Sequence, residues 1–130
     1  MRTRSDIKRE NGVVLIPRDA DEAFRKALMD GVPPSLRPKM REALAATPDP
    51  NAIKAIRHSR RYFGEEASKI FADASGLAAE LHRFLAGRFQ LNGLLDWLTA
   101  TGYGNDYRMI KVFAEWARMA KASEKKLIIP

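Results

Sequence analysis

The segment that begins at Glu65 carries the strongest pattern in the sequence and constrains the fold more than any other. Its apolar residues step by four, three, four and three positions: Ile70, Ala74, Leu77, Leu81 and Phe84. Because an α-helix turns every 3.6 residues, this spacing places all five side chains on one face. The pattern predicts one amphipathic helix of about six turns. It continues through Gly76 and must bury its apolar face against other elements.

Two earlier segments carry the start and stop signals of helices. Residues 19–31 begin with acidic side chains, which suit a helix N-terminus, and end at a glycine, which suits a C-terminus. In residues 35–46, Ser35 is placed to cap the helix and Pro38 falls in its first turn. We therefore expect two short helices separated by a proline-containing break.

Three further helices complete the expected set. Asp49 followed by Pro50 reads as an N-cap and a first-turn proline, which start a helix that runs towards Gly64. Apolar residues then recur at helical spacing over residues 91–100 and 109–120.

The fold class that follows is all-α, with about six helices in one compact, bundle-like domain over residues 18–122. Residues 1–17 form a basic N-terminal arm whose apolar run, residues 12–17, is either one short strand or an extended segment. Residues 123–130 form a C-terminal tail that ends in Leu127, Ile128, Ile129 and a proline. We expect both ends to be extended and to lie on the protein body or on a neighbour.

Composition excludes several classes of protein. The chain has 130 residues, of which 45% are hydrophobic and 30% charged, an ordinary balance for a folded domain. It contains no cysteine, which excludes disulfides and thiolate catalysis and fits a reducing compartment. No apolar run approaches the roughly 20 residues that span a bilayer, and the N-terminus lacks the apolar core of a secretory signal. The sequence therefore predicts no association with a membrane.

The residues that carry most enzyme chemistry are scarce. His58 and His82 are the only histidines, and neither has a second metal-ligating residue at helical spacing. The six serines fall in expected caps, helix faces and tails, and Glu65 and Glu66 read as first-turn acids. No set of residues supplies a nucleophile, a base and oxyanion donors. We expect a protein that is not an enzyme and that uses no metal and no cofactor.

The glycine-rich stretch GYGND, residues 102–106, resembles a phosphate-binding loop at first sight. A dinucleotide fingerprint needs a third glycine where Tyr107 stands, and it follows a strand rather than a leucine-rich helix. A simpler reading is a joint between two helices. Gly102 ends the first helix, Gly104 permits the turn, and Asn105 or Asp106 caps the second.

The net charge of +7 is concentrated in the N-terminal half of the chain. Its clearest cluster is KAIRHSRRYF, in which one helix face carries Lys54, Arg57, His58 and Arg61, with Arg60 close by. Such a face suits phosphates, and Tyr62 adds a ring for stacking on bases. The alternatives are an acidic protein partner, or simply a solvated face whose opposite side, Ile53, Ile56 and Phe63, is buried.

After the last leucine-rich segment come a Gly-x-Gly-Asn joint, two apolar positions and a polar end: Thr101, Gly102, Gly104, Asn105, Ile110, Phe113, Ser123 and Glu124. At these positions the C-terminal segment resembles a segment of tailed-phage head-assembly (scaffold-like) proteins. The resemblance covers about a quarter of the chain. This chain is short and basic, whereas scaffolding proteins are longer and acidic. The resemblance therefore implies a small protein that stays in the particle, or one that phage makes to bind a host target.

These observations lead to three hypotheses for function. The first is a phage structural or head-assembly protein that binds copies of itself or proteins of the phage head or portal region, located in the virion or the host cytoplasm. Trp97 and the tail residues Leu127, Ile128 and Ile129 would then bind partners. The second is a nucleic-acid-binding module that uses Lys54, Arg57, Arg60, Arg61 and Tyr62. The third is a phage-encoded inhibitor that binds an acidic host protein through the same face.

Overall fold

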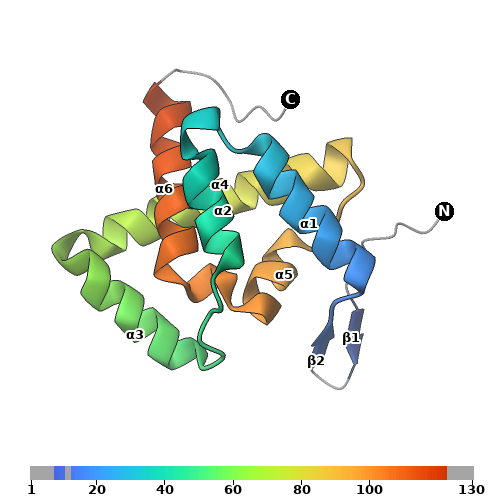
Figure 1. The fold of residues 1–130 in the computed structure, drawn as a ribbon, viewed down its shortest axis with the longest axis horizontal. Helices are drawn as coiled ribbons and strands as arrows, with labels where there is room; N and C mark the ends of the chain where they lie inside the picture. The colour runs from blue at the N-terminus through green and yellow to red at the C-terminus, as the bar shows by residue number, and fades with distance from the viewer. Residues whose placement is uncertain (1–7, 11–12, 123–130) are drawn as a thin grey trace.

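The computed structural model describes residues 8–10 and 13–122 and is almost entirely helical (Figure 1). The all-α fold class predicted from the sequence is confirmed. Short 3-10 turns, η1 (Pro34–Leu36), η2 (Gly64–Glu66) and η3 (Tyr103–Asn105), link the longer elements. The α-helices of the described residues are α1 (Arg18–Gly31), α2 (Arg37–Ala45), α3 (Ala52–Phe63), α4 (Ala67–Arg88), α5 (Leu94–Thr101) and α6 (Tyr107–Ala122).

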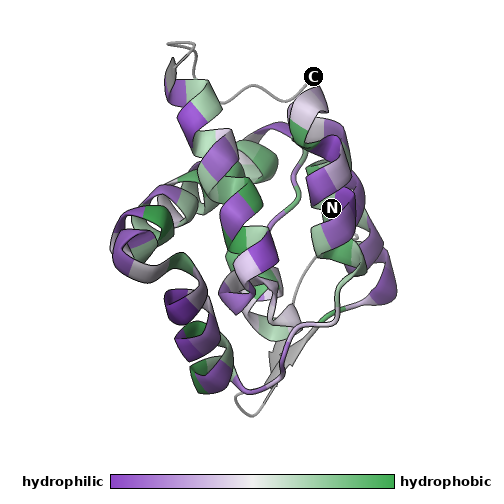
Figure 2. Ribbon diagram, turned by 60° about the vertical axis from the view of Figure 1, so that its left-hand side comes forward, coloured by the Kyte–Doolittle hydropathy of each residue, from purple (hydrophilic) through white to green (hydrophobic). Residues whose placement is uncertain are grey.

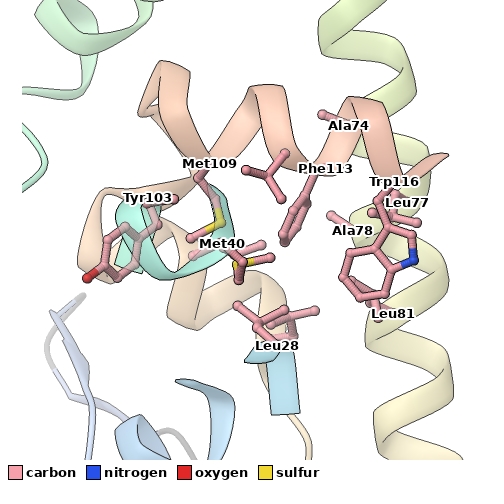
Figure 3. Packing of buried hydrophobic residues seen from close by; sticks show 14 of the residues in the cluster. Leu28, Met40, Ala74, Leu77, Ala78, Leu81, Tyr103, Met109, Phe113 and Trp116 are labelled. Carbon is pink, nitrogen blue, oxygen red and sulfur yellow. The ribbon is translucent and has the colours of Figure 1, made fainter. Parts of the chain in front are cut away.

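Helix α4 is the predicted long helix, and it runs without a break for 22 residues. It buries Ile70, Ala74, Leu77 and Leu81, as the spacing predicts, and packs chiefly on α6. Phe113 and Trp116 of α6 reach into the contact between the two helices (Figure 3). Gly76 lies inside α4 at a position where an added Cβ would meet no atom within 4 Å. This glycine therefore costs helix propensity but does not interrupt the fold.

Trp97 belongs to the core, which corrects its prediction as a partner-binding residue. Its side chain is 0% exposed and stacks on Phe24 of α1 at a centroid distance of 5.5 Å. Its indole Nε1 donates a hydrogen bond to Oδ1 of Asp21, 2.8 Å away. The sequence pattern placed Trp97 beside the leucine stripe of α5, and the structure shows that α1 covers this side of the helix as well.

Two predicted helix starts were wrong by a few residues. Ser35 does not cap α2, because η1 precedes that helix and the Ser35 hydroxyl lies 3.8 Å from the sulfur of Met119. Helix α3 begins at Ala52, and its N-cap is Asn51, whose side chain accepts a hydrogen bond from the Lys54 amide. Asp49 instead accepts a hydrogen bond from the Asn51 amide, and so it orders the turn before the cap.

Residues 8–10 and 13–15 pair as a two-stranded antiparallel hairpin rather than forming a lone strand or an extended segment. Strand β1 (Lys8–Glu10) pairs with β2 (Val13–Leu15), with Arg9 opposite Val14. The apolar run thus takes its partner strand from the basic residues just before it. The predicted C-terminal contacts of Leu127, Ile128 and Ile129 lie outside the described residues.

Candidate interaction surface

Helix α3 lies at the edge of the molecule (Figure 1), and its fully buried side chains are small. Its buried residues are Ala55 and Ser59. The Ser59 hydroxyl is 0% exposed and donates a hydrogen bond of 2.8 Å to the backbone carbonyl of Asn105 in η3. Gly64 ends the helix with a φ of +64°, a conformation that glycine adopts readily. Most of the surface of α3 therefore faces solvent.

The cations predicted to share one face of this helix do so. Lys54, Arg57, His58 and Arg61 are all exposed and lie three, four and seven positions apart; we call them the basic face. Helix α3 contains no acidic residue. Within residues 8–10 and 13–122, no ion pair involves its lysine or any of its arginines. Figure 2 turns this side of the molecule forward and shows purple bands alternating with green along α3.

Arg60 occupies a different position from the other cations. It lies on the side of α3 that turns towards α4, with its guanidinium 5.2 Å from the centroid of the Phe71 ring. A cation over an aromatic ring is stabilised by the ring's negative face without losing its hydrogen-bonding capacity at the edge. Arg60 thus presents a charge beside apolar surface rather than on the open basic face.

The prediction that Ile53 and Ile56 form a buried side of α3 was wrong. Ile53 is 70% exposed and Ile56 is 37% exposed, while Phe63 is half-buried beside Phe71. Helix α3 packs through Ala55, Ser59 and the half-buried Phe63, so Ile53 falls outside the contact and Ile56 lies at its margin. Scattered exposed apolar residues are normal in proteins. Ile56 is notable because it lines a cavity, and Ile53 lies one turn away from it on the same helix.

The cavity has a volume of about 310 Å³ and lies between α3, α4, α5, α6 and η3. This volume is at the lower end of the roughly 300–1,000 Å³ typical of ligand pockets. Its wall is predominantly apolar, and Arg60 is the charged residue that lines it; the lining includes Ile56, Phe71, Ala78, Met109 and Phe113. We call this cavity, together with the neighbouring Ile53, the α3 groove. No local pattern in the sequence predicts it, because its walls come from five different elements.

On its other side, α3 contributes to an aromatic cluster. Tyr62 is 51% exposed, and its ring centroid lies 4.4 Å from that of Tyr107 at the start of α6. His58 meets the same Tyr107 ring edge-on at 5.3 Å, and the guanidinium of Arg108 lies 5.1 Å from its centroid. The sequence predicts Tyr62 as a stacking residue but does not predict Tyr107, which it places only in the joint between two helices.

The GYGND stretch is a joint between helices, as expected. Gly102 ends α5 with a φ of +84°, and a Cβ on Gly104 would approach the backbone oxygen of Leu98 to 3.3 Å. Asp106 accepts hydrogen bonds from the backbone amide of Arg108 and from its Nε, each 2.9 Å long. The N-terminus of α6 is therefore already occupied by a carboxylate, which leaves little room for a phosphate there.

The buried carboxylate of Asp106 is held in its ionised form. Burial alone would raise its pKa, but the side-chain and backbone hydrogen bonds from Arg108 outweigh burial and lower the pKa from the ordinary value of 3.8. Nη2 of Arg108 also lies 2.7 Å from the second carboxylate oxygen. This bidentate pair fixes the start of α6, next to the aromatic cluster.

Other kinds of site would need a cluster of metal ligands, an unsatisfied polar group or a membrane-spanning helix. Across residues 8–10 and 13–122, no three His, Asp or Glu side chains gather closely enough to hold a metal ion. His82 is half-buried on α4, and its Nδ1 is a buried atom without a hydrogen-bond partner among the described residues. In the described part of the chain, no helix combines the length and the apolar character needed to cross a bilayer.

Comparisons with models of protein families, with curated proteins and with solved structures found no significant match. The α3 groove, the basic face and the aromatic cluster are therefore interpreted from their own chemistry.

Proposed function

We propose that this chain is a non-enzymatic binding protein that holds an acidic partner on the exposed surface of α3. The observation that carries the proposal is the basic face together with Arg60: a helix with no acid and with cations that form no ion pair among the described residues. Like charges three or four positions apart on a helix repel each other by about 0.2–0.5 kcal/mol per pair. An acidic partner would relieve this repulsion.

A protein partner is the leading form of this proposal. Phosphate groups need only the cations, whereas Ile53 and Ile56 add exposed apolar surface to the same helix. Apolar surface beside charges is typical of protein–protein contacts. The resemblance to phage head-assembly proteins adds a specific hypothesis, that the partner is another copy of the chain or a protein of the phage head or portal region. The hypothesis of a host-protein target involves the same surface.

The aromatic cluster favours a second candidate, binding of single-stranded nucleic acid. Tyr62 and Tyr107 offer ring faces beside the basic face, and proteins that bind single strands combine aromatic platforms with a positively charged groove. In that case binding would fall steeply with salt, because each phosphate contact releases counterions.

The experiment that tests the proposal compares the purified wild type with Arg57→Gln/Arg61→Gln. Native mass and the ratio of absorbance at 260 nm and 280 nm are measured at low and at high salt. A protein oligomer or complex free of nucleic acid supports the leading form. Nucleic acid that salt removes supports the second candidate.

Arg83→Gln/Arg88→Gln is the matched control, because it removes two exposed arginines from the half of α4 beyond the cavity. The proposal predicts that the α3 variant loses its partner and that the control keeps it. Equal retention of the partner by both variants would contradict the proposal, and so would a wild type that is monomeric and free of any partner under all conditions.

A further inference from the structure

We infer that the α3 groove binds an acidic amphipathic helix of a partner protein, whose apolar residue enters the cavity while its carboxylates meet Arg57 and Arg60. This inference rests on the proposed function, because it names the partner class for the same surface. Four observations support it: the cavity, the exposed isoleucines, the charges around them and the spacing of these residues on α3.

The cavity and the two isoleucines lie on the same side of α3. Ile56 lines the cavity, and Ile53 lies one turn away along α3 with 70% of its surface exposed. Beyond Ile56 the wall is made by Phe71, Met109 and Phe113, so the apolar surface leads from the outside of α3 towards the core. A large apolar side chain of a partner would fill the cavity and cover Ile53 at the same time. A free anion or a nucleic-acid backbone would cover neither.

The charged residues that α3 places beside the groove are of one sign. Ile56, Arg57 and Arg60 lie three, four and seven positions after Ile53, so the four residues share one side of the helix. Arg60 stands at the cavity itself, and Arg57 is shared with the basic face. A partner surface complementary to this side of α3 would carry apolar residues with carboxylates beside them, repeated at three- and four-residue intervals. This is the pattern of an acidic amphipathic helix.

Charge argues against the segments of this chain as occupants. The tail that follows α6, residues 123–130, brings two lysines and one glutamate, so it would place further cations against the arginines. Helix α1 is the most acidic helix, but its carboxylates at Asp21, Glu22 and Asp30 already pair with cations of α1. An acidic helix of another protein is more complementary in charge to the groove than the C-terminal tail or α1.

The test uses the full chain and two fluorescein-labelled peptides of about 18 residues, long enough to form a helix. One peptide has leucines at three- and four-residue spacing with glutamates beside them, and the other has the same composition with the leucines scattered. Fluorescence anisotropy measures binding of both peptides and of labelled oligothymidylate. Methyl and amide NMR spectra of the protein then locate the bound peptide.

The inference predicts that the amphipathic peptide binds about tenfold more tightly than the scattered one, and that NMR shifts concentrate at Ile53, Ile56 and Phe71. Ile53→Ser should weaken binding about tenfold, because it removes an exposed side chain that the peptide buries. Phe89→Ser is the matched control: Phe89 is 50% exposed and follows the C-terminal end of α4, far along that helix from α3. This control should leave binding unchanged.

Failure of the inference can be told apart from failure of the proposed function. If both peptides bind equally, if Ile53→Ser has no effect while Arg57→Gln/Arg61→Gln abolishes binding, or if oligothymidylate binds in preference to the peptide, the inference is overturned and the proposed function stands. If no anionic probe binds the wild type, both are overturned.

Discussion

The basic face makes a direct prediction about stability: replacing Arg57 with glutamine should stabilise the fold. Arg57 has three cations at helical distance, Lys54, Arg60 and Arg61. Each like-charge pair costs about 0.2–0.5 kcal/mol at low salt, so Arg57→Gln relieves about 0.6–1.5 kcal/mol. Glutamine has nearly the same helix propensity as arginine, so no other large change is expected. For a domain of 130 residues, 1 kcal/mol corresponds to about 3–5 °C in Tm.

Thermal unfolding followed by circular dichroism tests this prediction at about 0.01 M and about 1 M salt, where the Debye lengths are about 30 Å and 3 Å. The gain in Tm should be present at low salt and largely absent at high salt. Lys26→Gln is the control, because Lys26 lies 2.8 Å from Asp30 in an exposed ion pair. Removing this attraction should lower the Tm of the protein slightly at low salt instead of raising it. An unchanged or lower Tm of Arg57→Gln at low salt would refute the reasoning that these cations repel each other.

Three further predictions concern the body of the protein. Trp97→Phe should lower the free energy of unfolding in urea by about 2–3 kcal/mol, because it removes the hydrogen bond to Asp21 and part of a buried ring; a loss within error would contradict the buried position. Asp106→Asn should cost about 1–2 kcal/mol at neutral pH. Since the folded-state pKa of Asp106 lies below the ordinary value of 3.8, that difference should begin to shrink as the pH falls below this value, where the unfolded chain takes up the proton, and should be lost as the pH falls through the lower folded-state pKa; a constant difference across pH would refute the assignment. Gly102→Ala should lower Tm because φ is +84°, whereas Gly76→Ala should raise it slightly, and equal shifts would contradict both accounts.

The sequence predicted the helices well because their signals are local. The four-three-four-three spacing from Ile70 to Phe84 defined α4, and Gly102 with Asp106 defined the joint between α5 and α6. The hairpin was missed although its signal is present, since Asn11-Gly12 between two short runs is a typical hairpin turn sequence.

The candidate site could be predicted only in part. The spacing of Lys54, Arg57 and Arg61 established a common face, because that property belongs to one helix. The exposure of Ile53 depends on what lies opposite α3, and periodicity assigns apolar residues to the core without knowing their neighbours. The burial of Trp97 depends in the same way on α1, far away in the sequence. Contacts between distant segments, which also form the cavity, leave no local pattern.

The attachment of α3 through Ala55 and Ser59 has a consequence for how such a protein can change over generations. The fully buried residues of the helix are small, whereas Ile53, Lys54 and Arg57, which a partner would meet, are large and exposed. Substitutions at these three exposed positions should carry little penalty for folding. Different positions of the same helix thus serve binding and packing. A lineage can therefore acquire a new partner while it retains the fold.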